Sequence, residues 1–215
     1  MDDGFRETQD ERLVHRLIFF TDAVFAIVMT LLVLELRPPT SGLGQSATLA
    51  ELSGHLRAFA TSFALGGVFW LAHLSTMRRL EHFDWPVALA NLLFLLPVSL
   101  MPFTSAWVGR DGFTDGMAWA TYCSVLVAVS VGNVILVLVA TRDKGRLMNG
   151  ISGRERLYRL ARASSPGISF GVGLWLLITG HGILTLYCWV LIAPIMLLAR
   201  AFLGPRKVLA PLRKA

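Results

Sequence analysis

Long apolar stretches alternate with short polar ones along this chain, and the pattern predicts helices that span a membrane. A helix needs about 20 apolar residues to cross the hydrocarbon core of a bilayer. Six stretches meet or approach that length, and the predicted spans are 17–36, 57–77, 87–108, 117–140, 164–180 and 182–203. The fifth span is short and rich in glycine, and Pro166 suits its first turn. We therefore expect an all-α membrane protein with six transmembrane helices.

Composition supports this fold class. The chain has 215 residues, of which 54% are hydrophobic and 16% charged, and its mean hydropathy is +0.60. Soluble domains carry about 25% charged residues, so the composition indicates an integral membrane protein. A cleavable signal peptide is the alternative for the first span, but its apolar stretch is long and "ELRPPT" lacks a small-x-small site. Cys123 and Cys188 lie in apolar runs and are expected to be small core residues.

The cations predict the orientation in the membrane. Of the 20 lysines and arginines, 17 lie in the N-terminal tail, in the C-terminal end and in the segments after spans two and four. The positive-inside rule then places both termini in the cytoplasm of a multi-pass cell-membrane protein. The expected parts are a tail at 1–16, a six-helix domain at 17–203 and a basic tail at 204–215. Because the cations lie between spans, no nucleic-acid partner is expected.

The basic loop at 141–163 allows two interpretations. It could contact anionic lipid headgroups as a surface helix, or it could set the topology of the chain and bind nothing. Enzyme motifs such as GxxxxGK[ST], HExxH and CxxC are absent from the sequence. Ser99, Ser130 and His181 are candidate nucleophiles and bases, but no pair has a recognisable spacing. We expect neither an enzyme nor a cofactor.

One face of the first span has a distinctive pattern. At 100° per residue, Ala23, Ile27, Thr30 and Leu34 fall within about 60° of one another. A stripe with one hydroxyl among apolar residues could line a narrow aqueous path, since hydrophobic constrictions gate by dewetting. The alternative is ordinary packing, with the Thr30 hydroxyl bonded back to the carbonyl of Ala26.

Ionisable and polar residues near the ends of the spans indicate contacts between helices. Ionisable residues within or beside a span are costly and tend to be paired or functional. Asp22 points about 120° away from the stripe, towards neighbouring helices, and Arg16 lies on a different face from Asp22. Trp70 and His73, spaced i, i+3 in the second span, can donate hydrogen bonds to the Asp22 carboxylate. Asn91 in the third span is another candidate partner.

These residues also carry a family resemblance. Arg16, Phe20, Thr21 and Asp22 form R-x3-F-T-D, and the sequence continues as "DAVFAIVMTLLVLEL". This resembles the R-x3-F-[ST]-D signature in the first helix of the transmembrane protein 175 family, potassium channels of endolysosomes and bacteria. The similarity extends more loosely to "FWLAHLSTMRRL" and "NLLFLLPVSLMPF". The threonine in place of the usual serine keeps the hydroxyl.

The resemblance implies a homotetramer, because bacterial members of the family assemble four six-helix units around a central pore lined by the first helix. It implies a hydrophobic constriction at Ile27, a further apolar layer at Leu34 and a polar layer at Thr30, where a permeant potassium ion would pass. It implies passive conduction without a fixed metal ion. It also implies a structural network, which comprises Arg16, Phe20, Thr21, Asp22, Trp70 and His73, with a weaker case for Asn91.

A secondary transporter is the alternative function. Such proteins often place broken helices around a site at the middle of the membrane. The glycines of span five (Gly167, Gly171 and Gly173) and the prolines of span three (Pro97 and Pro102) could mark such breaks. They could equally serve close packing and gentle kinks. The absence of an acidic cluster in the middle of the spans favours the channel.

Overall fold

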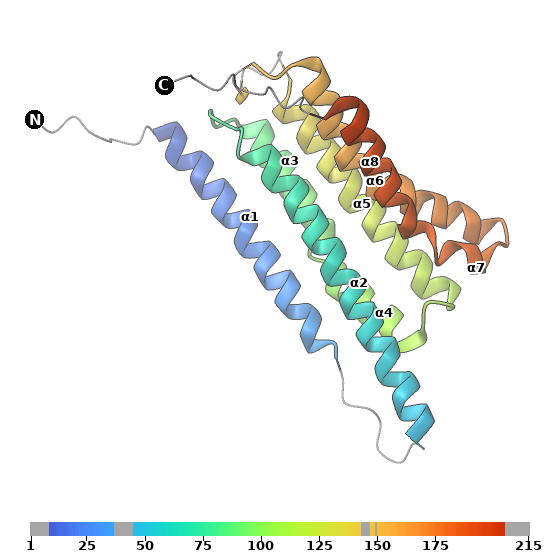
Figure 1. The fold of residues 1–215 in the computed structure, drawn as a ribbon. Coiled ribbons are helices and arrows are strands. Elements are labelled where there is room, and N and C mark those ends of the chain that lie inside the picture. The colour runs from blue at the N-terminus through green and yellow to red at the C-terminus, as the bar shows by residue number, and fades with distance from the viewer. Residues whose placement is uncertain (1–8, 37–44, 143–146, 149, 205–215) are drawn as a thin grey trace, which may run out of the picture.

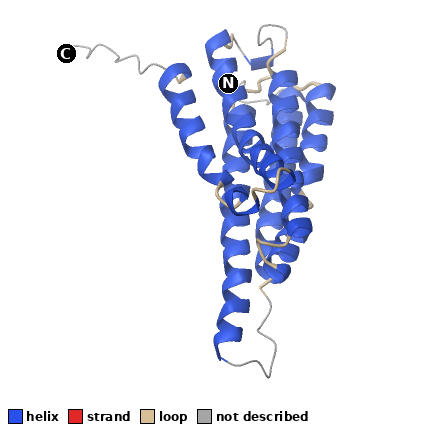
Figure 2. Ribbon diagram, turned by 90° about the vertical axis from the view of Figure 1, so that its right-hand side faces the viewer, coloured by secondary structure: helices blue, strands red, loops and turns tan. Residues whose placement is uncertain are grey.

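The computed structural model describes residues 9–36, 45–142, 147–148 and 150–204, and within these ranges the chain is helical and contains no strand (Figure 2). The elements in chain order are α1 (Gln9–Leu34), α2 (Gln45–Met77), α3 (Trp85–Val98), α4 (Met101–Asp111), α5 (Gly116–Ala140), α6 (Gly153–Ile178), α7 (Gly182–Thr185), the 3-10 helix η2 (Cys188–Leu191) and α8 (Ile192–Leu203). The long helices run side by side, with α1 along one edge (Figure 1).

Among the described residues, four stretches are long and apolar enough to cross a membrane: α1, residues 51–77 of α2, the α3–α4 segment and α5. They correspond to the first four predicted spans. The start of α1 and the end of α8 lie at the same end of the bundle (Figure 1). The chain is an all-α membrane protein, as the hydropathy pattern predicts.

The third span is divided where one helix was expected. α3 ends at Val98 and α4 begins at Met101, with Pro97 before the break and Pro102 after it. A proline lacks the N–H that the carbonyl four residues earlier needs, which weakens the helix at this point. The Ser99 hydroxyl donates to the carbonyl of Leu96 at 2.7 Å. The prolines therefore mark a short interruption, in which Ser99 and Leu100 keep helical backbone angles.

The fifth span is longer than predicted. α6 begins at Gly153, and the Ser152 side chain caps it by accepting a hydrogen bond from the N–H of Glu155. Hydropathy placed the start near 164 because the first half of the helix is highly charged. The prediction that Pro166 occupies the first turn is therefore wrong, since Pro166 lies inside the helix.

A side chain from α5 supplies hydrogen bonds to α6 where Pro166 interrupts the backbone hydrogen bonding of that helix. The Ser130 hydroxyl donates to the carbonyl of Ala163 at 2.6 Å and accepts from the N–H of Gly167 at 3.0 Å. It thus stands between two groups that would bond directly in a regular helix. A Cβ at Gly167 would lie 2.6 Å from the Ser130 oxygen, so the contact requires glycine.

The sixth span is not one continuous helix but consists of α7, η2 and α8. Thr185, at the end of α7, donates a hydrogen bond to the carbonyl of Gly173 in α6 at 2.9 Å and accepts one from the Trp119 indole at 2.7 Å. A Cβ at Gly173 would lie 2.8 Å from the Cys188 sulfur. Close contact with α6 and α5 therefore accompanies the interruption. Cys123 and Cys188 are free and buried, as expected.

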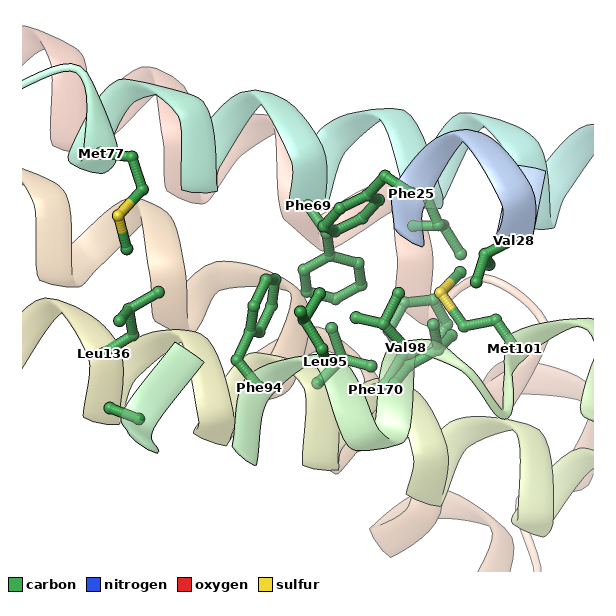
Figure 3. Close-up of a cluster of buried hydrophobic side chains, with 14 of the residues drawn as sticks. Phe25, Val28, Phe69, Met77, Phe94, Leu95, Val98, Met101, Leu136 and Phe170 are labelled. Atoms are coloured by element: carbon green, nitrogen blue, oxygen red, sulfur yellow. The ribbon is translucent and has the colours of Figure 1, made fainter. Parts of the chain in front are cut away.

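The hydrophobic core lies where α1, α2, α3 and α5 meet, and Figure 3 shows part of it. Phe25 of α1 contacts Phe94 of α3, with 5.8 Å between the ring centroids. A Cβ on Gly132 of α5 would lie 2.8 Å from the Cα of Phe94, so α3 and α5 approach each other almost backbone to backbone. This core positions the inner face of α1.

Candidate pore helix and its polar anchor

Helix α1 has a buried face and an exposed face. The buried residues are Val14, Thr21, Phe25, Val28 and Leu32. The sequence-predicted stripe of Ala23, Ile27, Thr30 and Leu34 lies about half a turn away and is exposed on the single subunit. Ile27 is 58% exposed and Leu34 70% exposed. The stripe is therefore available to line a path or to meet other molecules.

The Thr30 hydroxyl bonds to its own helix. Its oxygen lies 2.9 Å from the carbonyl oxygen of Ala26 and 2.9 Å from that of Ile27. The hydroxyl proton therefore points towards the backbone, and the oxygen lone pairs remain free on the exposed side of the helix. The back-bonded threonine and the outward oxygen ligand, which the sequence left as alternatives, are compatible with each other.

Asp22 ties α1 to α2. The indole N–H of Trp70 donates to the Asp22 carboxylate with a nitrogen–oxygen distance of 2.8 Å. Asp22 is only half-buried, and it points sideways from α1 towards α2 rather than along the exposed stripe. The sequence offered Trp70 and His73 as donors to Asp22; Trp70 makes this contact, whereas His73 bonds to Asn91.

A second chain of hydrogen bonds joins three helices beside this contact. His73 of α2 lies 2.9 Å from the Asn91 side-chain oxygen, and the Asn91 amide donates to the Thr21 hydroxyl at 2.8 Å. Thr21 donates in turn to the carbonyl of Leu17 at 3.0 Å. The Thr21 hydroxyl proton is used in the bond to Leu17, so the Thr21 oxygen accepts from the Asn91 amide. The Asn91 side-chain oxygen accepts from the His73 ring N–H.

This chain is completely enclosed. Thr21 and Asn91 are 0% exposed and His73 is 1% exposed. The His73 ring stacks on Phe94 with 5.4 Å between the ring centroids. Its second nitrogen, Nδ1, is buried and has no hydrogen-bond partner within the described part of the chain. Buried polar groups of this kind are costly to leave unpaired, so the bonds fix the rotation of α1 against α2 and α3. We call Thr21, Asp22, Trp70, His73 and Asn91 the polar anchor.

Two residues of the predicted network lie elsewhere. Arg16 and Phe20 are exposed on the side of α1 that carries the stripe, and Phe20 is 50% exposed. Counted at 100° per residue, Arg16 points in nearly the same direction as Ala23 and Ile27. The subunit alone does not bring them to the polar anchor, and their structural role stays a prediction.

Sequence reasoning missed a second polar cluster. The Ser62 hydroxyl of α2 donates to that of Ser105 in α4 at 2.9 Å and lies 3.0 Å from the Tyr122 hydroxyl of α5. Ser62 counted only as a polar interruption of the second span. Its place beside Thr61 in an otherwise apolar run was the available signal, because a hydroxyl buried in a bundle needs a partner.

The candidate nucleophiles have local structural bonds. Ser130 completes the α6 backbone, Ser99 bonds to Leu96, and the His181 ring lies 3.2 Å from the Thr179 hydroxyl. Neither Ser99 nor Ser130 contacts His181 through these bonds, and the Thr179 hydroxyl beside His181 donates to the carbonyl of Trp175 at 3.0 Å.

Comparisons with known proteins agree on one family. Residues 16–102 match the family model described as the endosomal/lysosomal potassium channel TMEM175. A potassium channel of a Chryseobacterium species is 33% identical over 131 residues, which cover 60% of this chain and 66% of that protein. A potassium channel of Chamaesiphon minutus is 30% identical over 182 residues, which cover 79% of this chain and 84% of that protein. The endosomal/lysosomal proton channel TMEM175 of Gallus gallus is 26% identical over 120 residues, only 24% of its own length.

Solved structures share the fold. A TMEM175 homologue from Chamaesiphon minutus, described as a lysosomal potassium-selective channel homologue, superimposes with a TM-score of 0.72 over 87% of this chain and 98% of that one, at 24% identity. A variant of the potassium channel MtTMEM175 gives a TM-score of 0.59 over 91% and 93%, at 19% identity. The family match begins at Arg16 and includes the exposed stripe and the whole polar anchor, and the Chamaesiphon relative aligns over most of both sequences; this chain belongs to the TMEM175 family.

Proposed function

We propose that this chain is the subunit of a passive cation channel that favours potassium, and that four copies surround one central pore. The observation that carries the proposal is the orientation of α1. Its inner face is fixed by apolar packing and the polar anchor, and this leaves Ala23, Ile27, Thr30 and Leu34 facing outwards. The bacterial relatives named as potassium channels support the choice of ion.

Each level of the stripe has its own role in this pore. Four Ile27 side chains form a hydrophobic constriction, which holds little water when narrow and so limits ion flow. Thr30 supplies a ring of four hydroxyl oxygens, whose lone pairs replace part of the water around a dehydrating cation. Leu34 forms a second apolar layer, and Ala23 leaves the path wider. Potassium sheds its water more readily than sodium, so this ring favours potassium modestly.

The broken segments keep a secondary transporter as the second candidate. The α3–α4 break and the α7–η2–α8 segment are discontinuities of the kind that transporters place around a substrate site. Here, however, apolar side chains such as Val98 and Met101 are buried at the α3–α4 break. In the sixth span, Thr185 and Cys188 pack closely against Gly173 of α6. These observations favour breaks with a structural role.

We also infer that both ends of the chain are cytoplasmic and that 1–16 and 204–215 are tails beside one channel domain at 17–203. The start of α1 and the end of α8 lie at one end of the bundle. The arginines of the first half of α6 lie at that same end. The positive-inside rule makes this end cytoplasmic.

Purified protein in liposomes separates the two functions. The channel predicts potassium flux that follows the membrane potential, needs no counter-ion and proceeds without a proton gradient. Strict coupling to a second ion would establish the transporter and contradict the channel. Because the vertebrate relatives are named proton channels, the same liposomes should carry a pH-sensitive dye so that proton flux is measured in parallel. The mass of the detergent-solubilised particle tests the predicted four copies.

A further inference from the structure

A pocket rich in arginine lies at the proposed cytoplasmic end of the subunit, away from α1. It has a volume of about 470 Å³ and lies between the end of α2, the first half of α6 and the end of α8. Arg79, Arg154, Arg159 and Arg162 line it, together with Tyr158 and Glu155. No part of the pore stripe or the polar anchor reaches it, so the proposed conduction path does not explain it.

The charges in the pocket do not balance. Glu155 is its one carboxylate among the described lining residues, and it pairs with Arg159 at 2.8 Å and with Arg79 at 3.4 Å. Arg154 donates to the carbonyl of Phe202 at 2.6 Å. Because a carbonyl is neutral, this bond does not neutralise the positive charge of Arg154. Arg162 lies over the Tyr158 ring, 5.8 Å from its centroid. Four guanidinium groups therefore face one carboxylate.

Arg159 gives the pocket a fixed wall. It is 9% exposed, and it donates to the carbonyl of Ser75 and to Glu155. The Nε–H groups of Arg159 and Arg162 are both buried, and neither has a hydrogen-bond partner among the residues that the structure describes. A buried donor without an acceptor is unfavourable, and more so when the group is charged. Two arginines with incomplete hydrogen bonding in the wall of one pocket indicate that a ligand supplies the missing negative charge.

The ligand that fits is an oxyanion with several acceptor atoms. Guanidinium groups bind phosphate through paired hydrogen bonds, with directional preference as well as charge. The N-terminus of α6, where Arg154 and Glu155 lie, adds the partial positive charge of a helix dipole. We propose that this pocket binds the phosphate group of an anionic molecule, which is either a phospholipid headgroup or a soluble phosphate compound.

An exposed apolar side chain lies near the pocket. Phe202 of α8 is 71% exposed. Phe202 is the residue whose carbonyl receives the Arg154 hydrogen bond, so its position beside the pocket is fixed. Such a side chain suits the acyl chains of a lipid whose headgroup occupies the pocket. The proposal does not depend on the channel function, because it concerns binding alone.

Native mass spectrometry of the purified full chain tests the binding. Phosphatidylglycerol, phosphatidylcholine and inorganic phosphate are titrated separately. The test variant is Arg154→Gln with Arg162→Gln. The matched control is Arg78→Gln with Arg156→Gln, which removes the same number of charges from exposed positions outside the pocket. We expect the test variant to bind at least about tenfold more weakly, the equivalent of one charge-assisted hydrogen bond, and the control to change little.

The three titrations identify the source of the phosphate. Binding of phosphatidylglycerol that inorganic phosphate does not displace supports the lipid headgroup, and displacement at millimolar concentration supports a soluble compound. Equal losses in the test variant and in the matched double control would overturn the proposal, because general surface charge would then explain the binding. The proposal would also be overturned if neither phosphatidylglycerol nor inorganic phosphate binds. If the double variant melts early, Arg79→Gln repeats the test from α2, since the Arg79 side chain is 57% exposed and can be replaced without disturbing the core.

Discussion

Helices α1 and α5 are equally apolar, yet the subunit buries them to different extents. In the most apolar part of α1, 22% of the residues are buried, compared with 50% in α5. Hydropathy therefore identifies both as membrane spans but does not tell an inner helix from a peripheral one. The difference lies in how each helix is held, and it shows which one requires a partner outside the subunit.

The two helices are attached by different means. α5 packs through small residues that allow close approach, such as Gly132 against Phe94, and through Ser130 inserted into α6. α1 has one narrow apolar face and a few buried hydrogen bonds from Thr21 and Asp22. Lipid is as apolar as these side chains, so close packing and hydrogen bonds hold helices together within a membrane. α5 completes the subunit, whereas α1 presents a free face.

The largest effect is expected from overfilling the α5 contact. In Gly132→Leu, the new Cβ would lie 2.8 Å from the Phe94 backbone, which cannot move aside as a flexible side chain can. We expect a loss of at least about 3 kcal/mol of stability and little monodisperse protein by size-exclusion chromatography. Gly171→Leu is the control, since a Cβ there meets nothing within 4 Å. Similar behaviour of the two variants would refute the close α3–α5 contact.

A smaller loss is expected from releasing the polar anchor. Asp22→Ala leaves the Trp70 indole without its acceptor, at a cost of about 1–3 kcal/mol. The subunit should still fold around α5, but α1 should loosen and the yield of assembled particles should fall. Trp70→Phe removes the donor, and the double variant should cost less than the sum of the single ones. Strict additivity would mean that the two residues do not act on each other.

The constriction predicts a change in conduction with little change in stability. Ile27→Asn places a polar side chain on the exposed stripe, wets the narrow point and raises single-channel conductance. A tenfold rise corresponds to a barrier lowered by about 1.4 kcal/mol. Val33→Asn is the control, because Val33 is 49% exposed but points about 120° away from Ile27. Equal conductance in the wild type and Ile27→Asn would place Ile27 outside the path.

The smallest effect concerns ion preference. Thr30→Val keeps the shape of the side chain and removes the hydroxyl oxygen, so the preference for potassium over sodium should weaken about fivefold, or ~1 kcal/mol. Thr30→Ser retains the oxygen and should stay close to the wild type. Reversal potentials under bi-ionic conditions measure both. An unchanged reversal potential in Thr30→Val would show that the Thr30 hydroxyl does not contribute to the preference for potassium.

The sequence was most informative where structure is local. The spacing of Ala23, Ile27, Thr30 and Leu34 follows from helix geometry alone, so the stripe could be predicted and α1 presents it on one face. The start of α6 was also encoded locally, in Ser152 and Glu155 of "SGRE". It was missed because hydropathy ends a span where charges begin, whereas a helix continues into water.

The irregularities of α6 and of the sixth span depend on contacts distant in sequence and could not be predicted. The tolerance of Pro166 inside α6 depends on Ser130 in α5, and the interruption after Thr185 accompanies its bond to Gly173. The polar anchor was predicted in part, since Asp22 and Trp70 do meet. The positions of Arg16 and Phe20 differ because a motif shows which residues occur together, not which of them touch within one subunit.

The most direct test of the central claim measures which side of α1 faces water in the conducting protein. Ile27, Thr30 and Leu34 are changed singly to cysteine, with Val28→Cys on the buried face as the control. The native Cys123 and Cys188 are buried and should give a low background. A charged, water-soluble thiol reagent should block current at the three stripe positions and leave Val28→Cys unaffected. Block at Val28→Cys, or protection at Ile27→Cys, would contradict the account.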